Sequence, residues 1–389
     1  MKRIFKIIFI VCIFPINIIA QGFDTTFAFG ISGPFGKGSI VTNILADSNK
    51  IFFSGYCRRD PLILSIDGLM PMLGAVDYQG NLLWWKGISF DSTRYFSGAS
   101  TFNNLLAKIS PDKYVMSAIG TDGIAVSNNF VKTYPYILLF SNQGDTIKLS
   151  HIPTYNDTLA FPPYLLIGGI CIDDNKNILL TGRYTNNSAY LPPDTSGLYI
   201  AKFDSNGVFQ WKKHYYSMLG NQINLSFMGF KILPANDGNG YMISSYKGSM
   251  DTLTANIFHF VRIDSIGNIL WEKDLPKANT LFGGGDNFER ADFIKAMDGS
   301  GYYFNSREYA DTSNMYFRFM SYIGKIDNIG NVVWAKTIDF NGINVTPNDM
   351  LQMDNGDLVF NIEINDPIST GLNNFSGTTL LRTDSLGNI

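Results

Sequence analysis

Residues 264–273 read DSIGNILWEK, and residues 327–336 repeat the phrase as DNIGNVVWAK. Related phrases, each an acidic or polar turn that closes on Gly, occur six times with a period of about 60 residues. That period is the size of one four-stranded blade, so the sequence predicts an all-β fold, a six-bladed β-propeller of antiparallel blades. The glycines of the six phrases are Gly80, Gly144, Gly207, Gly267, Gly330 and Gly387.

The phrase also predicts its own local structure. An Asp at the first position can accept hydrogen bonds from backbone N–H groups two and three residues further on, and Gly can adopt the positive φ that a bulged hairpin demands. The Trp that follows is expected on the outermost strand of its blade, where it covers the seam to the next blade. The structural residues predicted in this way are Trp84, Trp211, Trp271 and Trp334, together with Gly80, Gly207, Gly267 and Gly330.

A second family of tight turns recurs between the first and second strands of each repeat. In an antiparallel blade these turns lie at the same end as the first family, so the remaining connections emerge together at the opposite end. Those connections are long and unlike one another, which predicts a binding face there, although such loops also tolerate insertions without any role. The second family of turns begins at Asp47, Ser110, Asp173, Asn236, Asp298 and Asp354.

Aromatic and Arg side chains occur on these irregular connections. Aromatic rings beside Arg suit the recognition of a sugar or a peptide, and they suit loop packing equally well. The predicted ligand contacts are Arg58, Arg94, Tyr95, Phe161, Tyr164, Tyr216 and Phe282.

The repeats organise the chain into a signal peptide, residues 1–20, and a single propeller domain, residues 21–389. The sixth repeat stops before its fourth strand, and the segment 25–31 reads as a strand that lies before the first blade. We therefore expect this N-terminal strand to complete the sixth blade and close the ring, which removes an exposed edge. The predicted repeats are about 37–90, 101–152, 165–214, 224–275, 289–338 and 348–389.

The first twenty residues have the pattern of an export signal. Three cations precede an apolar run, 7–19, which is followed by a small residue, Ala20. Thirteen residues are short for a membrane span, so an uncleaved anchor is the weaker alternative, and a lipoprotein attached at Cys12 is weaker still. We expect a secreted or outer-surface protein, with the periplasm as an alternative, and no transmembrane segment after cleavage.

The net charge argues against some classes of binding partner, and the cysteine positions argue against a disulfide. Without its first twenty residues the chain carries 27 Lys and Arg against 33 Asp and Glu, which argues against nucleic acid or anionic lipid. Cys57 and Cys171 fall in the first and third repeats, too far apart for a disulfide, so both are expected as buried thiols. The oligomeric state stays open.

The sequence holds no recognised catalytic motif. His151, His214 and His259 each lack a second ligand at metal spacing, so they are expected at the surface or in the core. The turns offer one recurrent Asp each, too few for calcium, and residues 283–286 lack the Lys of a phosphate loop. We therefore expect no metal and no cofactor.

The phrase D-S-x-G-N-x-x-W-x-K resembles the repeats of a large group of secreted bacterial β-propeller proteins, many of them cargo of the type IX secretion system, whose blades are loosely similar to those of quinoproteins. The resemblance covers about residues 22–389 and implies a fold but no activity. Members commonly end in a sorting domain. This sequence stops inside a repeat, so either the export route differs or the chain is truncated.

These observations lead to two hypotheses of function. The first is an exported, noncatalytic binding or scaffold protein that uses the irregular connections to bind a glycan or a protein. The alternative is a cell-surface hydrolase, glycosidase-like, whose carboxylates converge from different blades at the channel mouth. The offsets within the phrase do not match the Asp-box of sialidases, and a quinoprotein dehydrogenase would need a quinone site.

Overall fold

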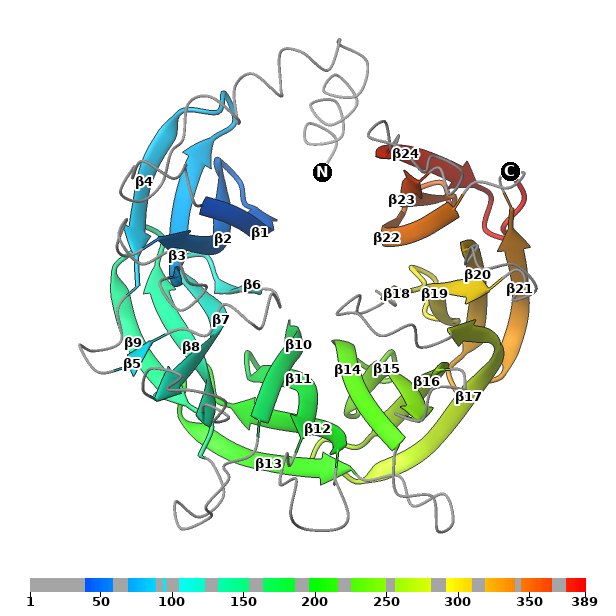
Figure 1. Ribbon diagram of the computed structural model, residues 1–389, viewed down its shortest axis with the longest axis horizontal. Coiled ribbons are helices and arrows are strands. Elements are labelled where there is room, and N and C mark those ends of the chain that lie inside the picture. The colour runs from blue at the N-terminus through cyan, green and yellow to red at the C-terminus, as the bar shows by residue number, and fades with distance from the viewer. Residues whose placement is uncertain are drawn as a thin grey trace, which may run out of the picture. The chain divides into compact units, whose positions relative to one another are not determined.

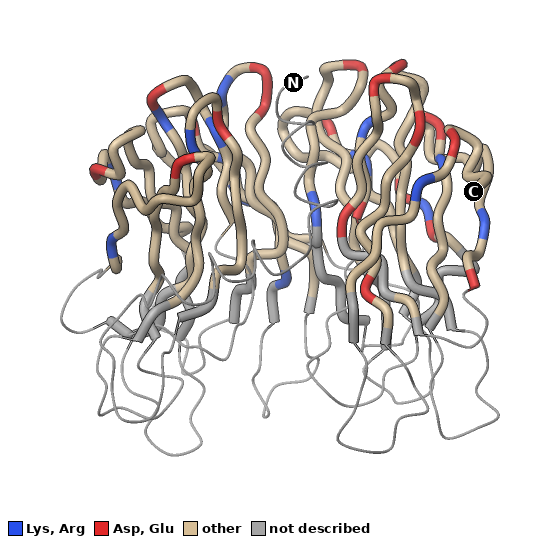
Figure 2. Tube along the Cα trace, turned by 90° about the horizontal axis from the view of Figure 1, so that it is seen from above, with Lys and Arg blue, Asp and Glu red and all other residues tan. Residues whose placement is uncertain are grey.

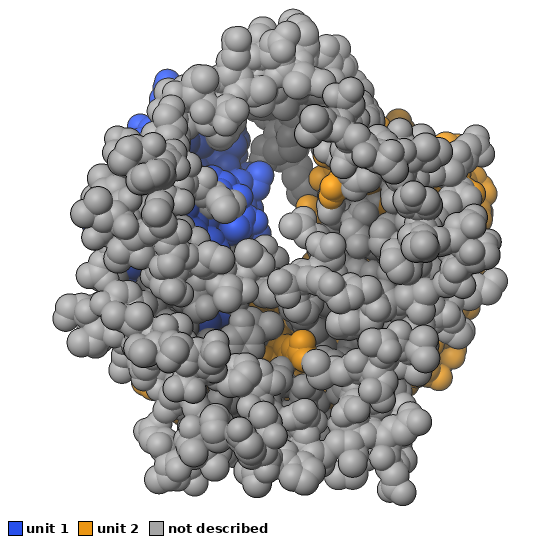
Figure 3. Space-filling model, viewed as in Figure 1, with its two compact units in different colours: residues 1–149 blue, residues 150–389 orange. Residues whose placement is uncertain are grey.

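The chain forms two compact units in the computed structural model, residues 1–149 and 150–389 (Figure 3). The described residues contain strands and turns but no helix, so none of them belongs to a helix of the length and apolarity needed to cross a membrane. The structure describes residues 39–58, 69–88, 94–95, 105–122, 132–153, 164–185, 196–215, 225–249, 256–280, 292–309, 319–339, 344–365 and 376–389.

The first unit carries two antiparallel sheets, which we number as blades 1 and 2. Blade 1 runs in chain order through β1 (Ser39–Ala46), β2 (Lys50–Arg58), β3 (Leu69–Asp77) and β4 (Leu82–Gly87). Blade 2 contains β6 (Leu106–Ser110), β7 (Lys113–Asp122), β8 (Lys132–Ser141) and β9 (Thr146–His151), and its last strand crosses the unit boundary. A two-residue strand, β5 (Arg94–Tyr95), adds a fifth member to blade 2 by pairing with β7.

The second unit carries blades 3 to 6, each again in chain order (Figure 1). Blade 3 is β10 (Tyr164–Ile172), β11 (Ile178–Thr185), β12 (Ser196–Phe203) and β13 (Phe209–Tyr215). Blade 4 is β14 (Leu225–Pro234), β15 (Tyr241–Ser249), β16 (Asn256–Ile263) and β17 (Ile269–Thr280). Blade 5 is β18 (Asp292–Lys295), β19 (Gly301–Tyr309), β20 (Phe319–Asp327) and β21 (Val332–Ile338). Blade 6 has three strands, β22 (Asn344–Gln352), β23 (Leu358–Asn365) and β24 (Ser376–Thr383).

This architecture confirms the predicted fold class, an all-β propeller of six antiparallel blades, the last with three strands. The segment 25–31, expected to complete blade 6, lies outside the described residues, so that closure stays a prediction. Within each unit the first strand of every blade lies on the inner side and the last on the outer side (Figure 1).

Burial explains why the middle strands are almost uninterruptedly apolar. In the described residues the second and third strands are buried at almost every position, so their side chains are enclosed whichever way they point. In the second unit, Phe258 and Phe260 of blade 4 pack with Phe304 of blade 5 in one core cluster. The outer strands β4 and β17 carry mainly exposed residues, because only one of their faces meets another blade.

The Asp-Gly turns form as predicted, with one correction. Asp264 Oδ1 accepts from the N–H groups of Ile266 at 3.0 Å and Asn268 at 2.7 Å, which are two and four residues further on rather than two and three. The N–H three residues on belongs to Gly267 and donates to the backbone carbonyl of Asp264 instead. Gly267 has φ +83°, the conformation the hairpin requires.

The tryptophans of the phrase lie against the glycine of the following turn. A Cβ placed on Gly330 of blade 5 would lie 2.6 Å from Cζ3 of Trp271 in blade 4, so the turn needs a residue without a side chain there. Lys213, two residues after the Trp of blade 3, likewise donates to Asn268 of blade 4 at 2.7 Å. We call this contact of Trp and Lys with the following turn the outer latch; its other tryptophans are Trp84 over Gly144, Trp211 near Gly267 and Trp334 over Gly387.

Candidate functional site

The predicted ligand contacts fall only in part within the described residues. Arg58 is the last residue of β2, Arg94 and Tyr95 form β5, and Tyr164 is the first residue of β10. In their blades these positions lie at strand ends away from the tight turns, where the sequence placed the irregular connections. Their side chains are outside the described part of the structure, as are the whole residues Phe161, Tyr216 and Phe282, so their binding role stays a prediction.

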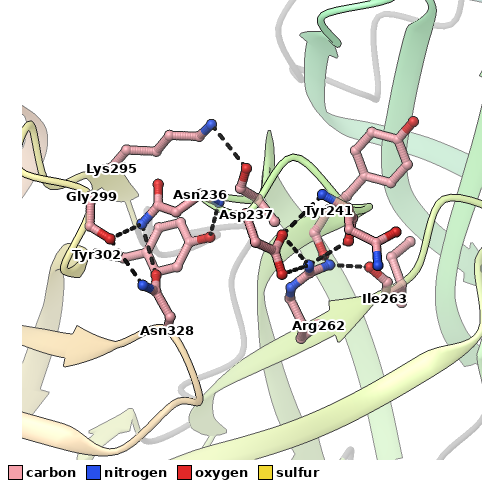
Figure 4. A network of polar contacts seen from close by, with 11 residues as sticks. Asn236, Asp237, Tyr241, Arg262, Ile263, Lys295, Gly299, Tyr302 and Asn328 are labelled. Carbon is pink, nitrogen blue, oxygen red and sulfur yellow. Dashed lines mark hydrogen bonds and ion pairs between the residues drawn. The ribbon is translucent and has the colours of Figure 1, made fainter.

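The tight turns at the other end join successive blades through hydrogen bonds. Figure 2 shows many of the acidic positions gathered at these turns, and Figure 4 shows the turn between β14 and β15. Asn236 donates from Nδ2 to the carbonyl of Gly301 at 2.9 Å and to Oδ1 of Asn328 at 2.8 Å, both in blade 5. Its backbone N–H donates to the hydroxyl of Tyr302 at 3.1 Å. Asn236 of blade 4 thus uses its side-chain amide donor and its backbone N–H to hold blade 5.

A buried Arg fixes the same turn from within blade 4. The side chain of Arg262 is 4% exposed, and its Nη2 donates to both carboxylate oxygens of Asp237, at 2.8 and 3.0 Å. The guanidinium also donates to the backbone carbonyls of Asn239 and Ile263. With its donors spent on the turn, Arg262 has a structural role.

Equivalent contacts occur at the junction of blades 3 and 4. The hydroxyl of Tyr241 donates to Oδ2 of Asp173 at 2.8 Å and accepts from Lys202 at 2.9 Å. Burial opposes ionisation of Asp173, but hydrogen bonds from Asn177 and Tyr241 outweigh it and lower the pKa of that carboxyl. In blade 2, Tyr114 bonds Asp47 of blade 1 in the same way. We call this contact of a Tyr or Asn with the neighbouring blade's tight turn the inner latch.

A different arrangement appears on the first strands of blades 4, 5 and 6. Lys231 on β14 forms an ion pair of 2.5 Å with Asp292 on β18. The first strand of blade 6, β22, lies beside β18 and carries Asp349. The negative charge of Asp349 raises the pKa of Asp292. Lys231 is 32% exposed at its side chain and Asp349 is exposed, whereas Asp292 is buried. We call these three residues the inner-strand cluster.

The three residues occupy equivalent positions in their blades. Lys231 lies opposite Ser244 on the second strand, Asp292 opposite Asn305, and Asp349 opposite Asn361. Residues directly opposite in an antiparallel pair project from the same face of the sheet, so each charged residue has a polar partner beside it. Lys231 and Asp349 also both follow a bulge, which turns a side chain out of the regular pleat.

The polar residues of the second strands are not fully hydrogen-bonded in these blades. Ser244 Oγ, Asn305 Nδ2 and Asn361 Oδ1 are buried atoms without a hydrogen-bond partner among the described residues. The equivalent Ser117 of blade 2 accepts from a backbone N–H, and Thr181 of blade 3 donates to a carbonyl. The unpaired atoms are therefore confined, at this position, to the three blades that carry charges.

Burial dominates the chemistry of Asp292. It raises the pKa of this carboxyl, and the negative charge of Asp349 acts in the same direction. The ion pair with Lys231 opposes the shift without cancelling it. A perturbed carboxyl beside unpaired buried groups is a physical signature of a functional position.

His259 and two nearby acids form a second cluster of titratable side chains among the described residues. Its Nδ1 lies 2.5 Å from Asp274 and its Nε2 lies 3.2 Å from Glu272, while Ser245 lies opposite it on β15. Ser245 is buried and donates to the backbone carbonyl of His259, so it is not a nucleophile held by the imidazole. In the described part of the chain, no three metal-ligating side chains gather.

The remaining histidines and the described cysteine have structural environments. Burial lowers the pKa of His214 to about 4, so its ring is neutral near pH 7, and His151 is exposed. Cys171 is a buried free thiol whose pKa burial raises, as expected for a core residue. The side chain of Cys57 lies outside the described residues.

The chain is similar in structure to two carbohydrate-active proteins. One is an ulvan lyase, a polysaccharide lyase of a new family, bound to GlcA(1-4)Rha3S; the TM-score is 0.52 at 9% identity, covering 91% of this chain and 81% of that one. The other is the NanB sialidase from Streptococcus pneumoniae, with a TM-score of 0.50 at 9% identity, covering 92% and 70%. At these identities the likeness shows the fold alone. No family model and no curated protein matches the sequence.

Proposed function

We propose that this chain is an exported, noncatalytic binding propeller that recognises a glycan or a peptide at the strand ends opposite the tight turns. One observation carries the proposal. Many of the described polar groups of the tight turns are hydrogen-bonded within their own turn or, in the outer and inner latches, to the neighbouring blade. Groups that are used within the turns are not available to a ligand, so we assign the main recognition surface to the irregular connections at the opposite strand ends.

A glycan is the ligand class that the comparisons favour. The ulvan lyase structure carries a bound saccharide, and a sialidase also acts on sugars, so propellers of this shape accommodate carbohydrate. The Arg and aromatic residues predicted as contacts suit a saccharide, because a ring can stack on its apolar face while Arg donates to its oxygens.

A surface hydrolase is the second candidate, and the inner-strand cluster is what favours it. Asp292 and Asp349 come from adjacent blades, and Asp292 has the raised pKa that a general acid needs. Two facts weigh against that role: Asp292 is buried, and its Oδ1 already accepts from Lys231 at 2.5 Å. A carboxyl held in this way does not reach a glycosidic oxygen.

Residues 21–389, purified after export, can be tested on glycan and peptide arrays. We expect binding that Arg94→Ala and Phe161→Ala weaken at least tenfold, because few interface residues carry most of the energy. Asp298→Asn, in a tight turn, is the matched control and should bind normally. Binding that both variants leave unaltered would show that the wrong connections were chosen, and cleavage of any arrayed ligand would overturn the noncatalytic role.

A further inference from the structure

We propose that the inner-strand cluster of blades 4 to 6 is a separate binding site for neighbouring hydroxyl groups of a sugar. Its walls are Lys231, which is partly exposed, and Asp349, which is exposed, and the unpaired buried groups of Ser244 and Asn305 lie opposite Lys231 and Asp292 on the second strands. The site lies toward the tight-turn ends of β14, β18 and β22. It therefore does not depend on the function proposed for the opposite strand ends.

Comparison of equivalent positions in the blades shows which residues the junction between blades does not require. At the position of Lys231, blade 1 has Asn43, whose Oδ1 accepts from the backbone N–H of Leu106 in blade 2, and blade 3 has Gly169. A neutral residue is thus sufficient to build the junction between blades. Charges at this position in blades 4, 5 and 6 are additions that the fold does not require.

Three buried polar atoms of these blades, on Ser244, Asn305 and Asn361, have no hydrogen-bond partner among the described residues. Leaving a buried donor or acceptor without a partner lowers stability, so three of them in successive blades are unfavourable for the fold. Native proteins place an ordered water or a ligand at such groups. Asn305 accepts the backbone N–H of Asp292 with its Oδ1 at 3.0 Å, so its unpaired Nδ2 lies beside the charged pair and lacks an oxygen to receive it.

The combination of hydrogen-bond donors and acceptors in the cluster indicates which class of ligand could bind there. The site offers donors from Lys231 and Asn305, an acceptor from Asp349, and a hydroxyl from Ser244 that does both. A metal ion would meet the ammonium of Lys231, and an anion would meet two carboxylates, so neither suits the whole set. A vicinal diol both donates and accepts, which lets it bridge Lys231 and Asp349 across the buried Asp292.

The test uses the mature chain and the methyl glycosides of glucose, galactose, mannose and rhamnose, followed by isothermal titration and saturation-transfer NMR. We expect at least one glycoside to bind, and Asp349→Asn and Lys231→Met each to weaken it more than tenfold, because both remove a charge-assisted hydrogen bond. Asp354→Asn, an exposed acid in the following turn of the same blade, is the matched control and should bind unchanged. Arg94→Ala should also leave this binding intact.

Three results would overturn the proposal. The first is that none of the four glycosides binds. The second is that Asp349→Asn binds as tightly as the unaltered chain. The third is a crystal soaked in a binding glycoside that shows only water at Asn305 and Ser244. The melting temperature of Asp349→Asn should stay at its original value, since Asp349 is exposed, which separates lost binding from lost folding.

Discussion

Two groups of aspartates in this molecule have opposite environments. The turn aspartates, such as Asp264 and Asp327, each accept backbone and side-chain hydrogen bonds from the Asn four residues further on, and although burial opposes it, those bonds lower the pKa of the carboxyl. Asp292 of the inner-strand cluster is buried, and burial raises its pKa in spite of its ion pair with Lys231. The turn environment favours the charged form of the carboxyl, whereas the buried environment of Asp292 disfavours it.

These two environments separate the scaffold of a repeat protein from its candidate functional positions. The outer latch recurs from blade to blade, and its Trp rings pack on the following turns, although the indole N–H groups of Trp84 and Trp334 have no hydrogen-bond partner among the described residues. The inner-strand cluster occurs in three blades and leaves buried groups unpaired. Features that recur serve the fold, whereas a charge that departs from the repeat at some cost in stability marks a candidate for function.

Removing a latch tryptophan should have the largest effect on stability. Trp271 is half-buried over the turn of blade 5, so Trp271→Ala is expected to cost about 2–3 kcal/mol, less than the loss of a fully buried Trp. Urea unfolding would measure it. Trp85, which is more exposed on β4, is the matched control, and Trp85→Ala should cost clearly less. Equal losses in the two variants would contradict the latch.

The glycine beneath that tryptophan gives a second test. Gly330 and Gly80 have φ of +83° and +86°, so Ala strains the backbone equally at both. Only at Gly330 would the new Cβ also meet Trp271; at Gly80 no described atom lies within 4 Å. Gly330→Ala should therefore destabilise by about 1–2 kcal/mol more than Gly80→Ala, as expected for overpacking. Equal melting temperatures of the two variants would mean that the Trp does not rest on the turn.

Each contact of the inner latch should contribute less to the free energy of unfolding than a tryptophan of the outer latch. Tyr241→Phe removes one hydroxyl that donates to Asp173 and accepts from Lys202, and the two charged groups remain 3.5 Å apart. We expect a loss of about 1–2 kcal/mol, the range for a hydrogen bond to a charged group. Tyr199→Phe is the control, because the Tyr199 hydroxyl has no hydrogen-bond partner among the described residues. Its removal should be neutral or stabilising, and a larger loss there would contradict the assignment.

The smallest effect is a difference in pH dependence. The lowered pKa of Asp173 gives stability that is present above its ordinary value of 3.8 and lost as the pH falls below it. Asp292, with a raised pKa, gives stability that is present below 3.8 and lost as the pH rises through its folded value. From pH 3 to pH 7, Asp173→Asn should therefore become less stable relative to the unaltered chain, and Asp292→Asn more stable. Melting temperatures at pH 3, 5 and 7 would show the two trends, and parallel trends would refute the contrast.

Most of the fold was predictable because its signals are local. The Asp, Gly and Trp of one phrase lie within eight residues, and their spacing alone predicts the hairpin and the seam. The partner of each hydrogen bond in the turn was harder to predict from the sequence. The turn Asp bonds the fourth residue rather than the third, since the third N–H is taken by the backbone, and no propensity rule contains that geometry.

The inner-strand cluster was not predicted because its members are far apart in sequence and carry no motif. Lys231, Asp292 and Asp349 come together only because the first strands of three successive blades lie side by side. Aligning the six repeats would have given one signal: a charge in the first strand opposite a small polar residue in the second. The irregular connections were predicted as a face, but the side chains expected to bind there lie outside the described residues.

The latches join successive blades, whereas the inner-strand cluster is the proposed sugar site, and one paired titration tests this division of roles. A methyl glycoside that binds the unaltered chain is titrated into Trp271→Ala and into Asp349→Asn, below the melting temperature of each. We predict that Trp271→Ala melts at a lower temperature but binds with an unchanged Kd. Asp349→Asn should melt normally and bind more than tenfold more weakly. The reverse pattern, in which the latch variant loses binding and the cluster variant keeps it, would contradict the account.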